Sequence, residues 1–269
     1  MRTTTSWLLG GFIVLAGLLP AAQARDHCGG SGRCGVPGNG LSPDELPTPP
    51  SDAQWADPDG PSPHVASIDS MPGGQSYGRW AVQWWQWLLS VPKASNPLSD
   101  VTGENCAMNQ VDKVWFLAGA GSPDSVVRSC TIPAGRSLFF PLINVVWAPF
   151  PEDPPEEKTE RFVRSHARCT NVRIEEATID GQKVPHPGRF FTGASGSRSA
   201  LFNALLPAGN LFDLDAGALL TPAAEQGYYL FVRPLSPGVH TIHWIASGCS
   251  EGGLQDITYH LKVVRPERR

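Results

Sequence analysis

The chain has 269 residues, with 21 basic and 25 acidic side chains that leave a formal net charge of −4 at pH 7. Charged residues make up 17% of the sequence, and lysine and arginine form no block. Nucleic acids and anionic membranes are bound through basic patches, so the composition argues against both classes of partner. The 28 glycines and 26 prolines favour short strands over long helices.

Residues 1–24 have the pattern of a cleaved secretory signal peptide. Arg2 precedes an uncharged apolar run from Trp7 to Leu19, and the small residues 22–24 supply a cleavage site. This run is too short for a comfortable membrane span, and no later segment reaches the roughly 18 apolar residues that a span needs. The sequence therefore predicts a secreted or periplasmic protein that is not membrane-spanning and whose mature chain begins at Arg25.

Six cysteines fit that compartment, because disulfides persist outside the reducing cytoplasm. Six half-cystines can pair in fifteen ways, so spacing alone leaves the connectivity open. Proximity in the sequence favours three bridges, namely Cys28–Cys34, Cys106–Cys130 and Cys169–Cys249. The alternative is a metal site, but Cys28 and Cys34 lack the C-x-x-C spacing of zinc proteins. We predict neither a bound metal nor a cofactor.

The composition divides the mature chain into a leader, one domain and a tail. Residues 25–75 are rich in glycine, proline, serine and aspartate, with too few apolar side chains to offset the entropy of ordering them. We predict that this segment is a disordered leader that serves as a spacer. Residues 76–265 then form a single domain, and residues 266–269 form a short tail.

The domain begins with a tryptophan-rich helix over residues 76–91. Ser76 can cap its N-terminus, and Pro92 ends it. Apolar side chains cover more than half of its circumference, which predicts a buried helix. The remaining polar positions form one narrow stripe, which meets water or lines a polar cleft: Arg79, Gln83, Gln86 and Ser90.

Runs of β-branched and aromatic residues, bounded by glycine or proline, predict the strands. They cover residues 111–118, 126–132, 138–147, 172–179, 228–232, 239–246 and 257–264. Asp180-Gly181 suits a tight hairpin turn, and the acidic, proline-rich residues 150–157 open a short second helix. The predicted fold is mainly β: an immunoglobulin-like or jelly-roll β-sandwich with one buried tryptophan-rich helix and a short second helix, stapled by disulfides.

Three segments near the C-terminus carry a resemblance to known proteins. Residues 227–230, 234–244 and 256–263 resemble the closing strands of immunoglobulin-like β-sandwiches in secreted bacterial proteins. The tryptophan-rich helix, with residues 96–103 and 114–119, also resembles a family of exported bacterial proteins of unknown activity. The resemblance covers residues 77–264. It implies a fold and a compartment, and it implies no catalytic residues.

Two groups of polar residues are candidate ligand contacts. Arg79, Gln83 and Gln86 would touch a ligand if the helix borders a cleft, where indoles can also stack on sugar rings or apolar ligands. Alternatively, the helix only packs on a sheet. Asp100 and Glu104 flank a Thr-Gly turn that can hold a cation or serve acid–base chemistry.

The histidines suggest a weaker metal hypothesis. In a strand over residues 239–246, His240 and His243 point to opposite faces and cannot both ligate one ion. His260 would lie beside His243 if their strands pair, which gives two ligands and no third. A histidine bonded to the backbone is the commoner arrangement, so we predict no metal.

Motifs of nucleophilic and nucleotide-dependent enzymes do not occur in the sequence. It contains no Gly-x-Ser-x-Gly elbow, phosphate-binding loop or His-Glu-x-x-His motif. We therefore predict a non-enzymatic binding or interaction module for a small molecule, glycan or protein. The alternative is a secreted hydrolase or lyase that acts on an extracellular polymer or small substrate through carboxylates and histidine. Convergence of Arg79, Asp100, Glu104 and a histidine in one cleft would favour the enzyme.

Overall fold

The computed structural model describes residues 64–110, 113–121, 124–250 and 253–265. The predicted signal peptide, the Cys28–Cys34 bridge, most of the leader and the tail lie outside the described residues. Within the described part, no helix is both long enough and apolar enough to cross a membrane.

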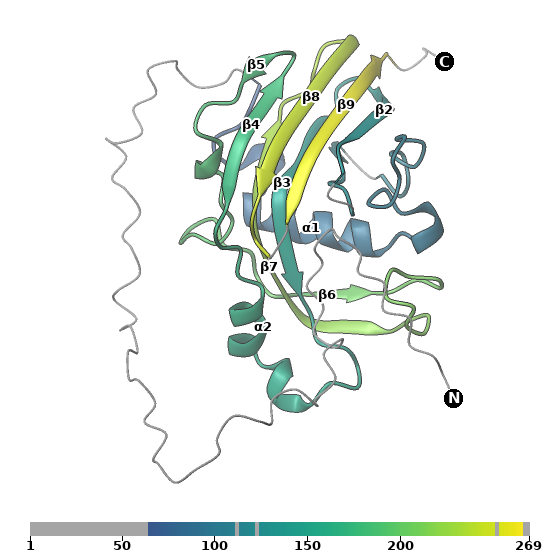
Figure 1. Ribbon diagram of the computed structural model, residues 1–269, viewed down its shortest axis with the longest axis vertical. Helices are drawn as coiled ribbons and strands as arrows, with labels where there is room; N and C mark the ends of the chain where they lie inside the picture. The colour runs from purple at the N-terminus through teal and green to yellow at the C-terminus, as the bar shows by residue number, and fades with distance from the viewer. Residues whose placement is uncertain (1–63, 111–112, 122–123, 251–252, 266–269) are drawn as a thin grey trace.

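Two β-sheets form the body of the protein (Figure 1). The first sheet has the order β1-β3-β7-β6, with bounds Val114–Phe116, Ser137–Trp147, Leu219–Val232 and Phe202–Leu205. The second has the order β2-β9-β8-β4-β5, with bounds Val126–Pro133, Leu254–Val264, Gly238–Ser247, Arg173–Ile179 and Gln182–Lys183. The pairs β1–β3 and β2–β9 are parallel, and the other pairs are antiparallel.

Two α-helices accompany the sheets: α1 (Tyr77–Leu89) and α2 (Glu160–His166). Short 3₁₀ turns lie at Pro72–Gly74, Lys93–Ser95, Pro155–Lys158 and Pro187–Arg189. The mainly β class with two helices is therefore confirmed.

The molecule has three layers, because β3 is covered on both faces. Phe139 of β3 contacts Tyr77 of α1, with ring centroids 5.9 Å apart. Its neighbour Phe140 points the other way and stacks on Trp244 of β8 at 4.9 Å. Helix α1 thus crosses the outer face of the first sheet, and the second sheet covers the inner face (Figure 1). Burial on both sides explains why β3 is almost continuously apolar.

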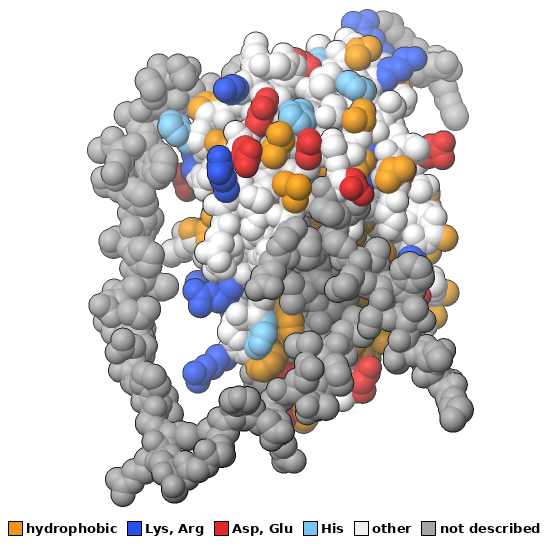
Figure 2. Space-filling model, viewed as in Figure 1, with side chains coloured by type: hydrophobic (Ala, Val, Ile, Leu, Met, Phe, Trp, Pro, Cys, Tyr) orange, Lys and Arg blue, Asp and Glu red, His pale blue; other side chains and the backbone are white. Residues whose placement is uncertain are grey.

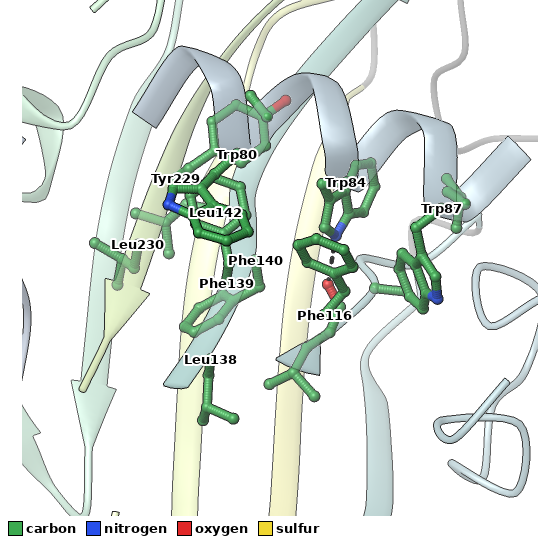
Figure 3. Close-up of a cluster of buried hydrophobic side chains, with 14 of the residues drawn as sticks. Trp80, Trp84, Trp87, Phe116, Leu138, Phe139, Phe140, Leu142, Tyr229 and Leu230 are labelled. Atoms are coloured by element: carbon green, nitrogen blue, oxygen red, sulfur yellow. Dashed lines mark hydrogen bonds between the residues drawn. The ribbon is translucent and has the colours of Figure 1, made fainter. Parts of the chain in front are cut away.

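Helix α1 is buried as predicted, and its indoles form the centre of the aromatic core. Ser76 caps the helix by accepting a hydrogen bond from the Arg79 backbone N–H. Trp80, Trp84 and Trp87 point from the helix towards the sheet (Figure 3). Their indole N–H groups donate to backbone carbonyls of Pro72, Leu117 and Met108. A buried indole that keeps a hydrogen-bond partner gains apolar contact without stranding its N–H group.

Two disulfides hold peripheral segments to the sheets. Cys106–Cys130 ties the loop after α1 to β2, and Cys169–Cys249 ties the segment after α2 to the end of β8. Both pairings agree with the predicted connectivity. Bridges of this kind typically stabilise a fold by about 2–4 kcal/mol, mainly by restricting the unfolded chain.

The predicted leader is too long by at least twelve residues, because residues 64–75 pack on the domain. Val65 and Ala66 are buried, and Val65 forms a β-bridge with Val232 at the end of β7. The Tyr77 hydroxyl donates to the Ala66 carbonyl across 2.7 Å. Among the described residues, the packed domain therefore includes those from His64 onward, ahead of the predicted boundary at residue 76. Composition did not reveal this packing, because the segment holds only a few apolar residues and is also held by a backbone hydrogen bond from Ala66 to Phe231.

Strand β7 is far longer than the predicted residues 228–232. It begins at Leu219 and runs through Pro222 and Gly227, two residues that usually mark the end of a strand. The hairpin predicted at Asp180-Gly181 is confirmed, because β4 pairs antiparallel with β5 directly after this turn. Strand β6 was not predicted, since it has only four residues. The part of β7 that was not predicted includes the buried acid Glu225.

Candidate functional site

The polar stripe of α1 is bound to the protein itself. The Gln75 side-chain oxygen accepts hydrogen bonds from Arg79 Nε at 2.7 Å and Gln83 Nε2 at 2.8 Å. Gln86 Nε2 donates to the backbone carbonyl of Asn203 on β6. The structure therefore brings Arg79 and Gln83 together and places Gln86 against another strand. Their role in ligand binding stays a prediction.

Asp100 organises its own loop. Its carboxylate accepts hydrogen bonds from the backbone N–H groups of Thr102, Gly103 and Asn105 at 2.8–3.0 Å. Burial alone would raise the pKa of Asp100, but these hydrogen bonds outweigh it and lower the pKa. Glu104 is exposed. Among the described residues, neither carboxylate forms a hydrogen bond or ion pair with Arg79 or with a histidine.

The histidines of β8 lie among carboxylates on the second sheet, where Figure 2 shows acidic and histidine side chains gathered. His243 Nε2 lies 3.1 Å from Asp256, and its Nδ1 lies 3.8 Å from Glu176. His260 pairs with Thr241 and not with His243. Within the described ranges, no group of three or more His, Cys, Asp and Glu residues is arranged to hold a metal ion.

A cleft between the two sheets is one candidate site. It has a volume of about 150 Å³ and is lined by Val172, Ile174, Pro187, Gly188 and Tyr228. Ile174 belongs to β4 of the second sheet and pairs with Ala246, on the same face as Trp244, so its side chain points inward. Tyr228 belongs to β7 of the first sheet. The 3₁₀ turn Pro187–Arg189 closes one side.

Tyr228 is the lining residue of this cleft that has a polar side-chain group. Tyr229 faces α1, so strand alternation turns Tyr228 towards the second sheet. The ring of Phe191 stacks on Tyr228 at 4.9 Å, which fixes the phenol in place. Burial raises the pKa of Tyr228, so the hydroxyl keeps its proton. No described residue forms a hydrogen bond with this hydroxyl, which leaves it free to donate to, or accept from, a ligand.

A second, smaller hollow lies at the edge of β3 beyond its short pairing with β1. It offers about 30 Å³ and is lined by Trp84, Trp85, Leu98, Gly119, Ala120, Ile143, Asn144, Gly248, Gly253 and Gln255. A bulge at Leu142 shifts the register of β3 against β7. The extra residue turns Asn144 towards α1, where the regular alternation would have placed Ile143.

A buried hydrogen-bond network lies behind Asn144. Asn144 Nδ2 and Trp85 Nε1 donate to the Tyr229 hydroxyl at 3.0 and 3.2 Å. That hydroxyl donates to Glu225 Oε2 at 2.7 Å, and the Thr192 hydroxyl lies 3.4 Å from the same oxygen. Complete burial raises the pKa of Glu225 to about 7, although these hydrogen bonds oppose the shift.

Sequence reasoning missed both Tyr228 and Glu225. The pattern signalled Tyr228 only as a strand residue, and Glu225 lies outside the predicted part of β7. The sequence does contain one indication of Glu225: it is an acidic residue that directly follows the small apolar residues Ala223 and Ala224, as a buried acid would.

No protein-family model matches the chain, and no curated protein matches it. The resemblance to exported bacterial proteins stays a prediction.

Proposed function

We propose that this protein is an exported, non-enzymatic binding module that holds a ring-sized ligand in the cleft between its two sheets. The observation that carries the proposal is the Tyr228 hydroxyl, a polar group without a described protein partner in a cleft otherwise lined by Val172, Ile174, Pro187 and Gly188. Ligand sites commonly combine an apolar lining with a few polar groups that orient the ligand.

The volume of the cleft limits the size of the ligand. A cavity of about 150 Å³ accommodates a single six-membered ring such as benzene. The aliphatic side chains of Val172 and Ile174 favour an apolar ring, and the Tyr228 hydroxyl favours one polar substituent. Phenol has both features, and we use it as the probe.

The enzyme alternative has less support. The proposed acid–base residues Asp100 and Glu104 have no described contact with Arg79 or a histidine, and Asp100 is engaged by three backbone N–H groups. General acid–base catalysis requires its groups within hydrogen-bond reach of one substrate position. Scattered candidates favour binding over catalysis.

Export is part of the same proposal. The signal-peptide pattern of residues 1–24 and the pairings Cys106–Cys130 and Cys169–Cys249 support a secreted or periplasmic location. The immunoglobulin-like relationship of the closing strands belongs to the proposal as well, since the two facing sheets are compatible with it.

Titration of the oxidised protein with phenol and benzene, followed by NMR, tests the proposal. We expect both probes to shift resonances of Ile174 and Val172, with phenol bound more tightly. In Tyr228→Phe, phenol should lose about fivefold in affinity, the worth of one neutral hydrogen bond, while benzene binding is unchanged. In Ile174→Trp, the larger side chain fills the cleft, and neither probe should bind.

Tyr229→Phe is the matched control, because it removes a hydroxyl from the next residue on the opposite face of β7. It should leave phenol binding in the cleft unchanged. Equal phenol affinity in wild type and Tyr228→Phe, or shifts confined to residues far from the cleft, would contradict the proposed function.

A further inference from the structure

The direction of the buried hydrogen-bond network is fixed by the Tyr229 hydroxyl. A phenol hydroxyl has one proton to donate and accepts through its lone pairs. When Glu225 is ionised, Tyr229 donates that proton to Glu225 Oε2, the shortest contact of the network at 2.7 Å. Its oxygen is then left to accept, which it does from Trp85 Nε1 and Asn144 Nδ2.

This direction determines how the Asn144 amide is oriented. If Asn144 were flipped, its oxygen would face the Tyr229 oxygen, whose only proton is already committed to Glu225. The amide nitrogen therefore points inward, and Oδ1 is the amide atom left for the hollow at the edge of β3. Gly227, directly opposite Asn144 on β7, makes the room: a Cβ there would lie 2.5 Å from the Asn144 Cβ.

The other polar side chains of the hollow are already engaged. Gln255 accepts from the Ala120 N–H and donates to the carbonyls of Ala120 and Leu254. The indole N–H groups of Trp84 and Trp85 donate to Leu117 and Tyr229. Among the described side chains that line the hollow, Asn144 Oδ1 is thus the polar atom without a protein partner, and it is an acceptor.

We propose that this hollow is a second binding site, separate from the cleft at Tyr228, and that it selects small ligands that donate a hydrogen bond. Glu225, through Tyr229, sets that preference by holding the Asn144 amide with its oxygen outward. The volume of about 30 Å³ is close to the space that one water molecule occupies in the liquid. The hollow therefore admits an N–H or O–H tip rather than a whole ring.

Pyrrole and furan are suitable probes, because they have nearly the same shape and differ in the heteroatom. Pyrrole donates through its N–H group, whereas furan can only accept. At pH 8.5, where Glu225 is ionised, we expect pyrrole to bind the wild-type hollow about fivefold more tightly than furan, as one added neutral hydrogen bond implies. The side-chain amide resonances of Asn144 and the indole N–H resonance of Trp85 report binding at this site.

Tyr229→Phe removes the oxygen that holds the amide, so the preference for pyrrole should fall below about twofold. Glu225→Gln retains Tyr229 and tests the same point by another route. A neutral glutamine amide can donate to Tyr229, which frees the tyrosine proton for Asn144 and lets the amide take either orientation. The preference should fall here as well. Tyr228→Phe, on the opposite face of β7, should keep the wild-type preference.

Each outcome decides the proposal. A pyrrole preference in wild type and Tyr228→Phe that is lost in Tyr229→Phe and Glu225→Gln supports it. Equal binding of the two probes to wild type, binding of neither, or an unchanged preference in Glu225→Gln overturns it. Failure of phenol to bind at Tyr228 would leave this result unaffected, so the two proposals fail separately.

Discussion

Replacing Glu225 by glutamine should raise the stability of the protein at alkaline pH and leave it nearly unchanged at acidic pH. Glu225 is buried, and its Oε1 has no described hydrogen-bond partner. Its pKa rises from 4.5 to about 7 on folding. The folded state therefore holds the carboxyl proton more tightly than the unfolded state. Stability falls as the pH rises from about 4.5 to 7, where the folded state must give up that proton.

The size of this pH-dependent change in the free energy of unfolding follows from how far folding raises the pKa of Glu225. A difference of about 2.5 pKa units at 1.36 kcal/mol per unit corresponds to about 3 kcal/mol. Glutamine has nearly the shape of glutamate and no proton to lose in this range. The stability of Glu225→Gln relative to wild type should therefore increase by about 3 kcal/mol between pH 4 and pH 8.

Urea unfolding of the oxidised wild type and variant at half-unit pH steps measures this difference. Other titrating groups cancel in the comparison of the two proteins. Glu156→Gln, an exposed acid in the Pro155–Lys158 turn, is the matched control and should change stability by less than about 0.5 kcal/mol throughout. A difference between Glu225→Gln and wild type that stays constant with pH would refute the reasoning.

Three further expectations concern contacts away from the two sites. Arg128→Met should cost about 3 kcal/mol in urea unfolding, because it leaves the carbonyls of Asp100 and Gly119 without their buried donor; an unchanged midpoint would argue against these contacts. Burial alone would lower the pKa of His240, but its hydrogen bonds to Asp180 and Ser236 outweigh burial and raise it. Protonated His240 therefore stabilises the fold fully below pH 6.5, and this stabilisation is lost as the pH rises through the raised pKa. The deficit of His240→Gln in unfolding should therefore be larger at pH 5.5 than at pH 8.5, and a constant deficit would be inconsistent with this account. Reduction of both disulfides should lower the melting temperature by several degrees, whereas an unchanged melt would show that they contribute little.

The sequence predicted the elements whose local signals agree with their tertiary role. Helix α1 is an example: Ser76 caps it, and its tryptophans mark it as buried. Strand β7 is the opposite case, because Pro222 and Gly227 end the local pattern while neighbouring strands carry the structure through them. Local propensity does not predict a strand whose position depends on pairing with neighbouring strands.

The candidate sites were less predictable than the fold. Arg79 and Gln83 stood out as a polar stripe, yet Gln75 engages both, a contact that depends on how the segment before the helix folds back. The cleft at Tyr228 depends on the spacing of two sheets and on the distant turn Pro187–Arg189. Asn144 faces the hollow only because of the bulge at Leu142, which no residue pattern announces.

A crystal of the oxidised protein soaked in phenol tests the central claim most directly. The account predicts phenol between Ile174 and Tyr228, with its oxygen within hydrogen-bond distance of the Tyr228 hydroxyl. A cleft without phenol at saturating concentration, or a ring bound there with its oxygen turned away from Tyr228, would contradict it.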